Sequence, residues 1–490
     1  MGAARKRNKI LFITPPCHSG VVDVLGRWLP LNFVYMAGVA RLTGLDAEIY
    51  DARTKNHGYA EIEKSLRKTD ASYIAVTAIT STIDVSIKIL ELAKLINPHV
   101  ITIMGGVHPS FCYEEVLNTT TAVDFIICGE GEATLKELLH ALENGDDLSG
   151  ISGLAFRQDG RIIKSSKRPL IGNIDELPTA WDLLEWQDYT YFVIPNSRLG
   201  AIGTSRGCEL GGVLCFRQND LEQKRRLRDH RNVVEEIVHL YETYGVNIFL
   251  IADERPARDS ERWELFLELL IERGLPIYLL MESRSADIDR DRDIMWKYRK
   301  AGVVHVYIGI EAACQAADYS EKELDLTDGK TALDIIHEHG IVSEASFIVG
   351  LPEETRKSIE HTLRRAQYLN PDNVQFLPLT PWPYTDIYND VRQYIRVFDY
   401  SKYNLIDPII EPKKMSLLQM NVAIVDCYRK FYMGKMVEVM TMKNEFKRDY
   451  LMKAMKLIMG SSFFIKKMGM GTLGKVPAKI EEMMARINKA

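Results

Sequence analysis

Short apolar segments of strand length alternate with helical segments along most of this sequence, and this alternation is the strongest constraint on its fold. Residues 9–150 contain five such strand segments, "KILFITPP", "DAEIYDA", "YIAVTAITSTI", "VITIMGGVHPS" and "VDFIICGEGE". Helical patterns such as "PLNFVYMAGVARLTG" separate them. Strands that alternate with helices of this length predict right-handed βαβ units and a parallel, doubly wound sheet. We therefore predict an α/β domain over residues 1–150.

The alternation resumes near residue 198 and continues through six further strand segments. They are "LGAIGTSRGC", "VNIFLIADE", "IYLLMESR", "VVHVYIGIEAA", "VSEASFIVGLP" and "NVQFLPLTPWP". Six βα repeats predict a partial (β/α)6 barrel of the TIM type over residues 196–395, with its chemistry at the carboxyl ends of the strands. The intervening residues 151–195 are expected to form a hairpin, with its turn at Asp159-Gly160, and a linker.

Residues 396–490 are rich in Met and Lys and have a helical pattern. We interpret them as a cap that packs on the barrel. The alternative is a face that binds a membrane surface or a partner.

Composition excludes several broad classes. The chain has 490 residues, of which 46% are hydrophobic and 26% charged, as in globular proteins. A formal net charge of −5 argues against a general nucleic-acid binder. No apolar run has the length of a transmembrane segment, and no signal-peptide cleavage site follows the basic start, so a cytoplasmic location is expected. The seven cysteines are scattered and odd in number, which argues against a disulfide framework.

One pair of cysteines has a spacing that suggests a metal centre. In "TSRGCELGGVLCFRQ", Cys208 and Cys215 stand seven residues apart. A C-x3-C-x2-C loop of three thiolates holds an iron–sulfur cluster and leaves one iron open to a small ligand. Here Gly212 occupies the position of the middle cysteine. Two buried structural cysteines remain the alternative.

Charged residues and glycines recur where the predicted strands end. In the second series these ends read "ADE", "ESR", "GIEAA" and "FIVGLPEET", and in the first series "GGVHP" and "GEGE". Each alone fits a solvated charge or a turn glycine. Because the carboxyl ends of parallel strands meet at one edge, where ligands of such sheets bind, their joint occurrence predicts a binding site in each domain.

These motifs give the chain a family resemblance. "SRGC" with a second cysteine seven residues on, "GVNIFLIADE", "KAGVVHVYIGIEAA", "GIVSEASFIVGLPEET" and "TPWPYTDIYNDV" are similar to the radical SAM superfamily. More closely, the whole chain resembles the cobalamin-binding subgroup typified by the anaerobic magnesium-protoporphyrin IX monomethyl ester cyclase. The resemblance implies a cobalamin-binding domain, a radical SAM core and oxidative ring closure on a magnesium porphyrin. The chemistry it implies is hydrogen abstraction by a 5′-deoxyadenosyl radical, with water as the oxygen source.

The resemblance also implies roles for individual residues. Cys208 and Cys215 match ligands of a [4Fe–4S] cluster. S-adenosylmethionine is expected to meet Asp253 and Glu254 through its ammonium group, Arg284 through its carboxylate, Glu311 through its ribose, and Gly350 through its adenine. The cobalamin-binding edge is expected to comprise Thr77, Thr82, Gly105, Gly106, His108, Gly129 and Glu130. The D-x-H-x-x-G motif that supplies a histidine to cobalt is absent, so no such ligand is implied. For His108 the alternative is a hydrogen-bonded turn histidine.

Gly212 leaves three explanations open. Another group, with Glu209 the nearest oxygen donor, could complete the cluster site. The cluster could be absent, leaving a non-catalytic protein that binds a tetrapyrrole. The sequence could also be a variant of an active parent.

Two enzymatic functions fit the architecture, the cyclase and a cobalamin-dependent methyltransferase. Expected partners are a tetrapyrrole or other hydrophobic substrate and an electron donor such as ferredoxin or flavodoxin. The basic segment "LEQKRRLRDHR" either neutralises carboxylates of the substrate or forms a solvated face.

Overall fold

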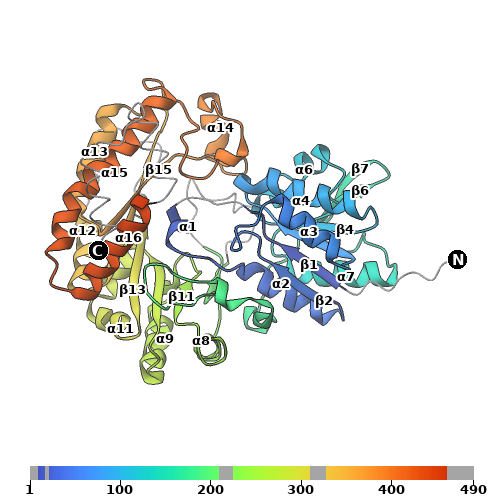
Figure 1. Ribbon diagram of the computed structural model, residues 1–490, viewed down its shortest axis with the longest axis horizontal. Coiled ribbons are helices and arrows are strands. Elements are labelled where there is room, and N and C mark those ends of the chain that lie inside the picture. Colours follow the sequence, from blue (N-terminus) through green and yellow to red (C-terminus); the bar gives the residue numbers. More distant parts are fainter. Residues whose placement is uncertain (1–8, 17–20, 209–223, 310–326, 461–490) are drawn as a thin grey trace.

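The computed structural model describes residues 9–16, 21–208, 224–309 and 327–460, which form two α/β units joined in series. In Figure 1 the first unit lies on the right and the second, with the C-terminal helices, on the left. Within these ranges, no helix combines the length and apolar character needed to cross a membrane.

A seven-stranded sheet forms the first unit, in the order β2-β1-β3-β4-β5-β6-β7. Its strands are β1 (Lys9–Ile13), β2 (Asp46–Tyr50), β3 (Tyr73–Thr77), β4 (Ile101–Gly105), β5 (Phe125–Ile127), β6 (Leu154–Gln158) and β7 (Arg161–Lys164). The first five are parallel, which confirms the doubly wound α/β prediction. The strand order reverses between β1 and β3, and ligands of such sheets bind at the carboxyl side of that point.

Helices cover both faces of this sheet. They are α1 (Val21–Leu25), α2 (Leu31–Leu42), α3 (Tyr59–Lys68), α4 (Ile83–Ile96), α5 (Val107–Phe111), α6 (Tyr113–Thr119) and α7 (Glu132–Asn144). Side chains alternate along each strand, so β1 sends Leu11 and Ile13 into a core shared with α3, α4 and α6. Ile10 and Phe12 point into the opposite core with α2 and α7. Burial on both faces explains why these strands read as continuous apolar runs.

The predicted hairpin is present and extends the first sheet. β6 and β7 pair antiparallel around Asp159 and Gly160, which have φ values of 50° and 75°. Positive φ at both central residues is what a two-residue hairpin turn of this kind requires, hence Asp-Gly. Since β6 also pairs antiparallel with β5, the hairpin forms the outer edge of the sheet.

The second unit is the predicted partial barrel. Six parallel strands lie in the order β15-β14-β13-β12-β11-β8. They are β8 (Leu199–Ile202), β11 (Ile248–Ile251), β12 (Tyr278–Ser283), β13 (Val303–Gly309), β14 (Val342–Val349) and β15 (Asn373–Pro378). The helices are α8 (His230–Tyr244), α9 (Ser260–Arg273), α10 (Ser285–Arg290), α11 (Met295–Lys300), α12 (Thr327–Glu338), α13 (Arg356–Leu369) and α14 (Ile387–Val391).

Two long helices, α15 (Leu417–Met440) and α16 (Glu445–Gly460), pack on the barrel, as the helical C-terminal prediction requires. Strand β15 is the outermost strand of its sheet, and α15 covers the edge that pairs with no other strand. The hydroxyl of Tyr428 lies 2.9 Å from the backbone nitrogen of Phe376, and that of Tyr432 lies 3.2 Å from that of Val374. The tyrosine hydroxyls thus accept hydrogen bonds from backbone N–H groups of an edge strand that could otherwise pair with another chain.

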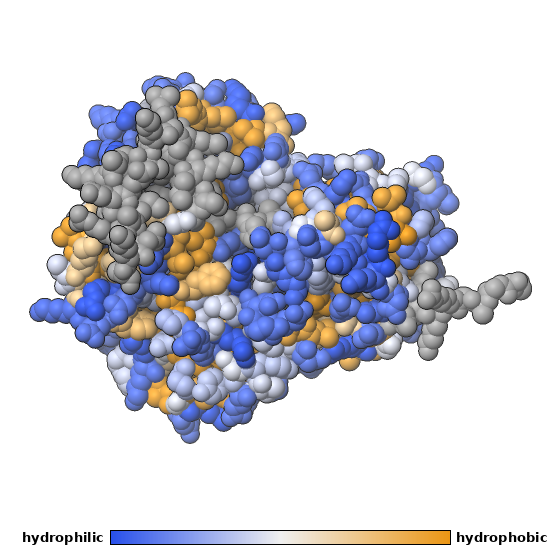
Figure 2. Space-filling model, in the orientation of Figure 1, coloured by the Kyte–Doolittle hydropathy of each residue, from blue (hydrophilic) through white to orange (hydrophobic). Residues whose placement is uncertain are grey.

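The outer face of α15 is partly apolar. Met433, Val437 and Met440 are each more than half exposed. Apolar surface is visible over the C-terminal helices in Figure 2, whereas much of the remaining visible surface is hydrophilic.

Candidate functional site

The strand ends of the barrel bring most of the predicted S-adenosylmethionine residues to one edge. Asp253 and Glu254 follow β11, Arg284 follows β12, and Gly350 follows β14. Because β11, β12, β13 and β14 are parallel neighbours, their carboxyl ends lie side by side. Cys208 is also described and is half-buried. The remaining predicted positions, Gly212, Cys215 and Glu311, lie outside the described residues.

A short ribbon forms the base of the loop that carries the cysteines, which we call the cluster loop (residues 207–225). Strands β9 (Ser205–Arg206) and β10 (Arg226–Leu227) pair antiparallel on either side of it. Gly207 has a φ of +89°, and a Cβ on it would lie 2.8 Å from the carbonyl oxygen of Lys224. The glycine of Ser-Arg-Gly-Cys is therefore required, because the two ends of the loop approach too closely for a side chain.

Asp253 fixes the chain just before the cluster loop. Its carboxylate accepts hydrogen bonds from the Thr204 backbone nitrogen at 2.6 Å, the Thr204 hydroxyl at 2.7 Å and the Ser205 hydroxyl at 2.5 Å. Asp253 is only 4% exposed, and burial raises its pKa despite these hydrogen bonds. The structure thus gives this residue a role in holding the loop, besides the contact with S-adenosylmethionine that the sequence predicts.

The other predicted S-adenosylmethionine residues have different surroundings. Glu254 is exposed, and Arg284 is half-buried at the N-cap of α10. Gly350 has a φ of +91°, and its backbone nitrogen donates to the Glu354 carboxylate at 3.0 Å. Burial raises the pKa of Glu354. Binding of S-adenosylmethionine by Glu254, Arg284 and Gly350 stays a prediction from the sequence.

The predicted cobalamin residues lie at the carboxyl ends of β3, β4 and β5. Gly106 has a φ of +105°, and a Cβ on it would lie 2.3 Å from the carbonyl oxygen of Ala78. Around Gly105, in contrast, an added Cβ meets no atom within 4 Å. This open stretch of backbone fits the close approach of a large flat ligand such as a corrin. Thr77 is half-buried beside it, and Thr82 is buried at the N-cap of α4.

His108 is buried between this edge and the segment that follows the barrel. Its Nδ1 lies 3.1 Å from the Thr80 hydroxyl, which in turn donates to the Tyr384 hydroxyl at 3.1 Å. The imidazole also packs edge-on against Tyr400, with ring centroids 5.1 Å apart. Burial lowers the pKa of His108 to about 4, so the ring is neutral. The turn-histidine interpretation accounts for Nδ1 but not for Nε2, which has no hydrogen-bond partner among the described residues.

Glutamates of the "GEGE" motif meet arginines that flank the cluster loop. Glu130 Oε2 accepts hydrogen bonds from Arg226 Nη1 at 2.8 Å and from the Ile171 backbone nitrogen at 2.9 Å. Glu132 accepts one from Arg206 at 2.7 Å. Burial alone would raise the pKa of Glu130, but the hydrogen bonds from Arg226 and Ile171 outweigh it and lower the pKa. Gly129, with a φ of +82°, is exposed beside this pair.

The basic segment is therefore used largely within the protein. Besides Arg226, Arg228 pairs with Asp175 at 3.0 Å and with Glu236 at 2.6 Å, and only 11% of its side chain is exposed. Sequence reasoning offered a substrate contact or a solvated face and missed these internal pairs. The sequence does show blocks of opposite charge, "GEGE" and "KRRLR", but not that they meet.

Comparisons with known proteins divide the chain as the fold does. A B12 binding domain model matches residues 18–139, and the radical SAM superfamily model matches residues 202–366. The structure is similar to that of OxsB, a cobalamin-dependent S-adenosylmethionine radical enzyme solved with aqua-cobalamin and S-adenosylmethionine bound. The TM-score is 0.69 at 15% identity, over 94% of this chain and 74% of that one.

Curated relatives span nearly the whole chain. An anaerobic magnesium-protoporphyrin IX monomethyl ester cyclase of Rubrivivax gelatinosus is 33% identical over 95% of this chain and 85% of its own length. An uncharacterised methyltransferase of Pyrococcus horikoshii is 31% identical over 87% of this chain and 92% of its own length. With both domains matched and identity of this extent, the chain belongs to the cobalamin-binding radical SAM superfamily, among relatives of the anaerobic magnesium-protoporphyrin IX monomethyl ester cyclases.

Proposed function

We propose that this protein is a cobalamin- and S-adenosylmethionine-dependent radical enzyme that performs oxidative ring closure on a magnesium porphyrin monomethyl ester. The observation that carries the proposal is the similarity to cyclases through both domains, with 33% sequence identity over 95% of the chain. A tetrapyrrole is then the substrate, and a ferredoxin or flavodoxin is a suitable electron donor.

The arrangement of the two domains supports this proposal. Ion pairs from Glu130 and Glu132 hold the base of the cluster loop against the carboxyl edge of the first sheet. In this proposal Cys208 and Cys215 hold the cluster, and Arg284 and Glu254 bind the carboxylate and ammonium groups of S-adenosylmethionine. The open backbone at Gly105 receives cobalamin. When bound, the cluster and S-adenosylmethionine supply a carbon radical, which no amino-acid side chain can provide.

A specific observation favours each of two alternatives. The methyltransferase relative matches at 31% identity over 92% of its length, and the same architecture serves both reactions. Gly212, in place of the middle cysteine, favours a tetrapyrrole-binding protein without a cluster.

Anaerobic reconstitution with iron and sulfide tests the cluster first. Iron is counted per chain, and the EPR spectrum of the reduced protein is recorded with and without S-adenosylmethionine. Close to four irons and a spectrum that changes on adding S-adenosylmethionine support an enzyme. A wild-type chain that holds no cluster, while Gly212→Cys restores one, supports the binding protein. Cys208→Ser is the control that removes a proposed ligand in either background.

Product analysis then separates the two reactions. The reconstituted protein is incubated with magnesium-protoporphyrin IX monomethyl ester, hydroxocobalamin, S-adenosylmethionine and a low-potential reductant. A product with a new ring and an oxygen from labelled water supports the cyclase. A product that carries one additional methyl group contradicts the cyclase and supports the methyltransferase.

A further inference from the structure

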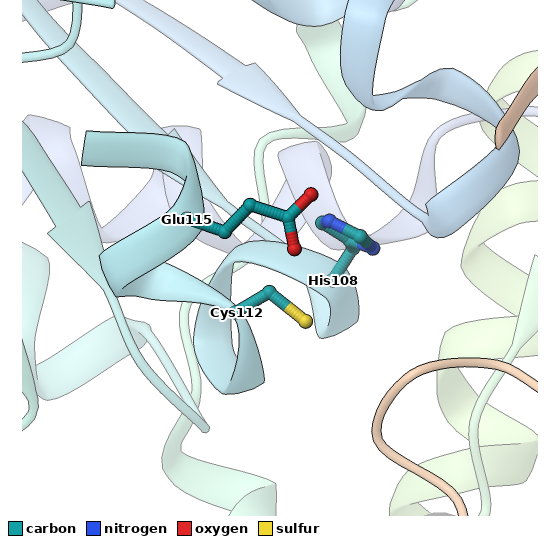
Figure 3. Close-up of side chains that lie close together, drawn as sticks. All are labelled: His108, Cys112 and Glu115. Atoms are coloured by element: carbon teal, nitrogen blue, oxygen red, sulfur yellow. The ribbon is translucent and has the colours of Figure 1, made fainter. Parts of the chain in front are cut away.

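Three potential metal ligands converge beside the carboxyl edge of the first sheet, apart from the cysteines of the cluster loop. One ligand atom each from His108, Cys112 and Glu115 lies within 4.8 Å of the others. Figure 3 shows the imidazole and the carboxylate facing one another, with the sulfur of Cys112 nearby. His108 and Cys112 are one helical turn apart, joined by the hydrogen bond from the Cys112 backbone nitrogen to the His108 carbonyl oxygen at 2.8 Å.

The hydrogen bonds around His108 determine which ring nitrogen is available. The Thr80 hydroxyl gives its proton to Tyr384, so it accepts a hydrogen bond from Nδ1–H of His108. This leaves the lone pair on Nε2, where the described structure offers no hydrogen-bond donor, although the residue is 0% exposed. A neutral histidine whose other nitrogen is held by a hydrogen bond is the usual form of a metal ligand. A buried lone pair without a partner is otherwise unfavourable.

The two other ligands have room to adjust. Cys112 is half-buried and Glu115 is exposed at the start of α6, where Tyr400 donates to its carboxylate at 3.3 Å. Tetrahedral zinc places its ligand atoms about 3.5 Å apart, so atoms that now lie within 4.8 Å of one another must move closer by rotation of these two side chains. The combination of nitrogen, sulfur and oxygen donors suits Zn²⁺ better than Mg²⁺ or Ca²⁺, which prefer oxygen alone.

We propose that His108 Nε2, Cys112 Sγ and the Glu115 carboxylate bind one Zn²⁺, leaving a fourth position for water or another ligand. Binding releases the thiol proton of Cys112 to solvent, and no electrons are transferred. The ion joins α5 to α6. Through the packing of His108 and Glu115 against Tyr400, it also stabilises the contact between the first domain and the segment after β15. His108 also belongs to the edge expected to bind cobalamin, so the zinc site adjoins the function proposed above and is tested without cobalamin.

Zinc binding by the full-length chain tests the proposal. The parent carries Cys208→Ser and Cys215→Ser, which removes the thiols of the cluster loop, and no iron or cobalamin is added. After equilibrium dialysis against Zn²⁺, the parent is expected to hold one zinc per chain more than its Cys112→Ser or His108→Ala derivative. Cys128→Ser is the matched control, because Cys128 is another half-buried thiol of the same domain outside the ligand set.

Two further readouts separate metal binding from damage to the fold. Zn²⁺ is expected to raise the melting temperature of the parent and of Cys128→Ser but not that of Cys112→Ser, while all three melt alike with a chelator present. Co²⁺ is expected to give a thiolate-to-metal absorption band that Cys112→Ser abolishes. A parent that binds no zinc, or a Cys112→Ser chain that binds as much zinc as Cys128→Ser, overturns the proposal.

Discussion

Arg226 donates a hydrogen bond to Glu130 across the boundary between the two domains, with Nη1 and Oε2 2.8 Å apart. Only 8% of the arginine side chain and 17% of the glutamate side chain are exposed. The pair therefore lies in a shielded environment, where one charge left without its partner is costly. Because Arg226 begins the strand that leaves the cluster loop, the first domain fixes the position of the base of this loop.

Replacing Glu130 is expected to loosen the base of the cluster loop. We expect Glu130→Gln to reduce the local stability of the β9–β10 ribbon by about 3 kcal/mol, since Arg226 loses its countercharge while buried. Faster amide hydrogen exchange over residues 204–206 and 226–228 measures the loss.

Glu137→Gln is the matched control. Glu137 pairs with Arg168 in the same domain, but 48% of its side chain is exposed, so little stability depends on it. Equal exchange rates in the two variants would show that the interdomain pair does not hold the loop.

Adjacent glycines at the end of β4 are expected to respond oppositely to substitution. Gly106→Ala introduces a Cβ 2.3 Å from the Ala78 carbonyl oxygen at a φ of +105°, and is expected to destabilise the first domain by about 2 kcal/mol or more. Gly105→Ala meets no atom within 4 Å and is expected to change stability by less than about 0.5 kcal/mol. Urea unfolding of the cobalamin-free chain measures both. Gly105→Ala is still expected to weaken hydroxocobalamin binding, and unchanged affinity would remove Gly105 from the proposed corrin contact.

Asp253 is expected to control access to Cys208 before any cluster is bound. Asp253→Asn places an amide NH₂ group among the three donors of Thr204 and Ser205, at a cost of about 1–3 kcal/mol. The start of the cluster loop should then open more often, and iodoacetamide should alkylate Cys208 faster. Glu254→Gln, one residue on and exposed, is expected to leave the alkylation rate unchanged. If both variants react like the wild type, Asp253 does not hold the loop.

A buried ion pair attaches the last described helix to the barrel. Lys447 of α16 lies 2.7 Å from Asp372, and the side chains are 7% and 1% exposed. Burial alone would raise the pKa of Asp372, but His337, Lys447 and Lys435 outweigh it and hold the pKa well below its usual range. We expect Asp372→Asn to reduce the free energy of unfolding by about 3 kcal/mol at neutral pH, because Lys447 remains buried without its partner.

The pH dependence of this difference follows from the direction of the shift. A carboxyl whose pKa is lower in the folded state stabilises the protein above its unfolded pKa of about 3.9, and this stabilisation is lost as the pH falls below that value. The gap in stability between the wild type and Asp372→Asn should therefore be constant near neutrality and narrow below about pH 4. Urea unfolding at a series of pH values measures it. Glu353→Gln, from an exposed pair with Lys413, is the control and should show little difference at any pH. A gap that widens on acidification would contradict the assignment.

Several features could be predicted from the sequence because they depend on local pattern. Apolar runs of strand length alternating with helical segments determine both sheets, since only βαβ units bury such strands on both faces. The turn at Asp159-Gly160 could be predicted because Asp followed by Gly tolerates the positive φ that both positions adopt. The strand-end motifs likewise indicate the edge on which Asp253, Arg284 and Gly350 lie, because parallel strands end on the same side.

Only the tertiary structure decided which side chains of the first domain meet side chains of the later part of the chain. Glu130 and Arg226 are separated by 96 positions, and His108 meets Tyr400 over an even longer separation. Each of these residues has an equally good local interpretation, as a solvated charge or a turn histidine. Electrostatic pairing and ring packing depend on distance in space and on exclusion of water, which are set when the two domains pack together. The sequence by itself determined the sheets and the edges at which ligands are predicted to bind, whereas packing of the domains determined which charges hold the base of the cluster loop.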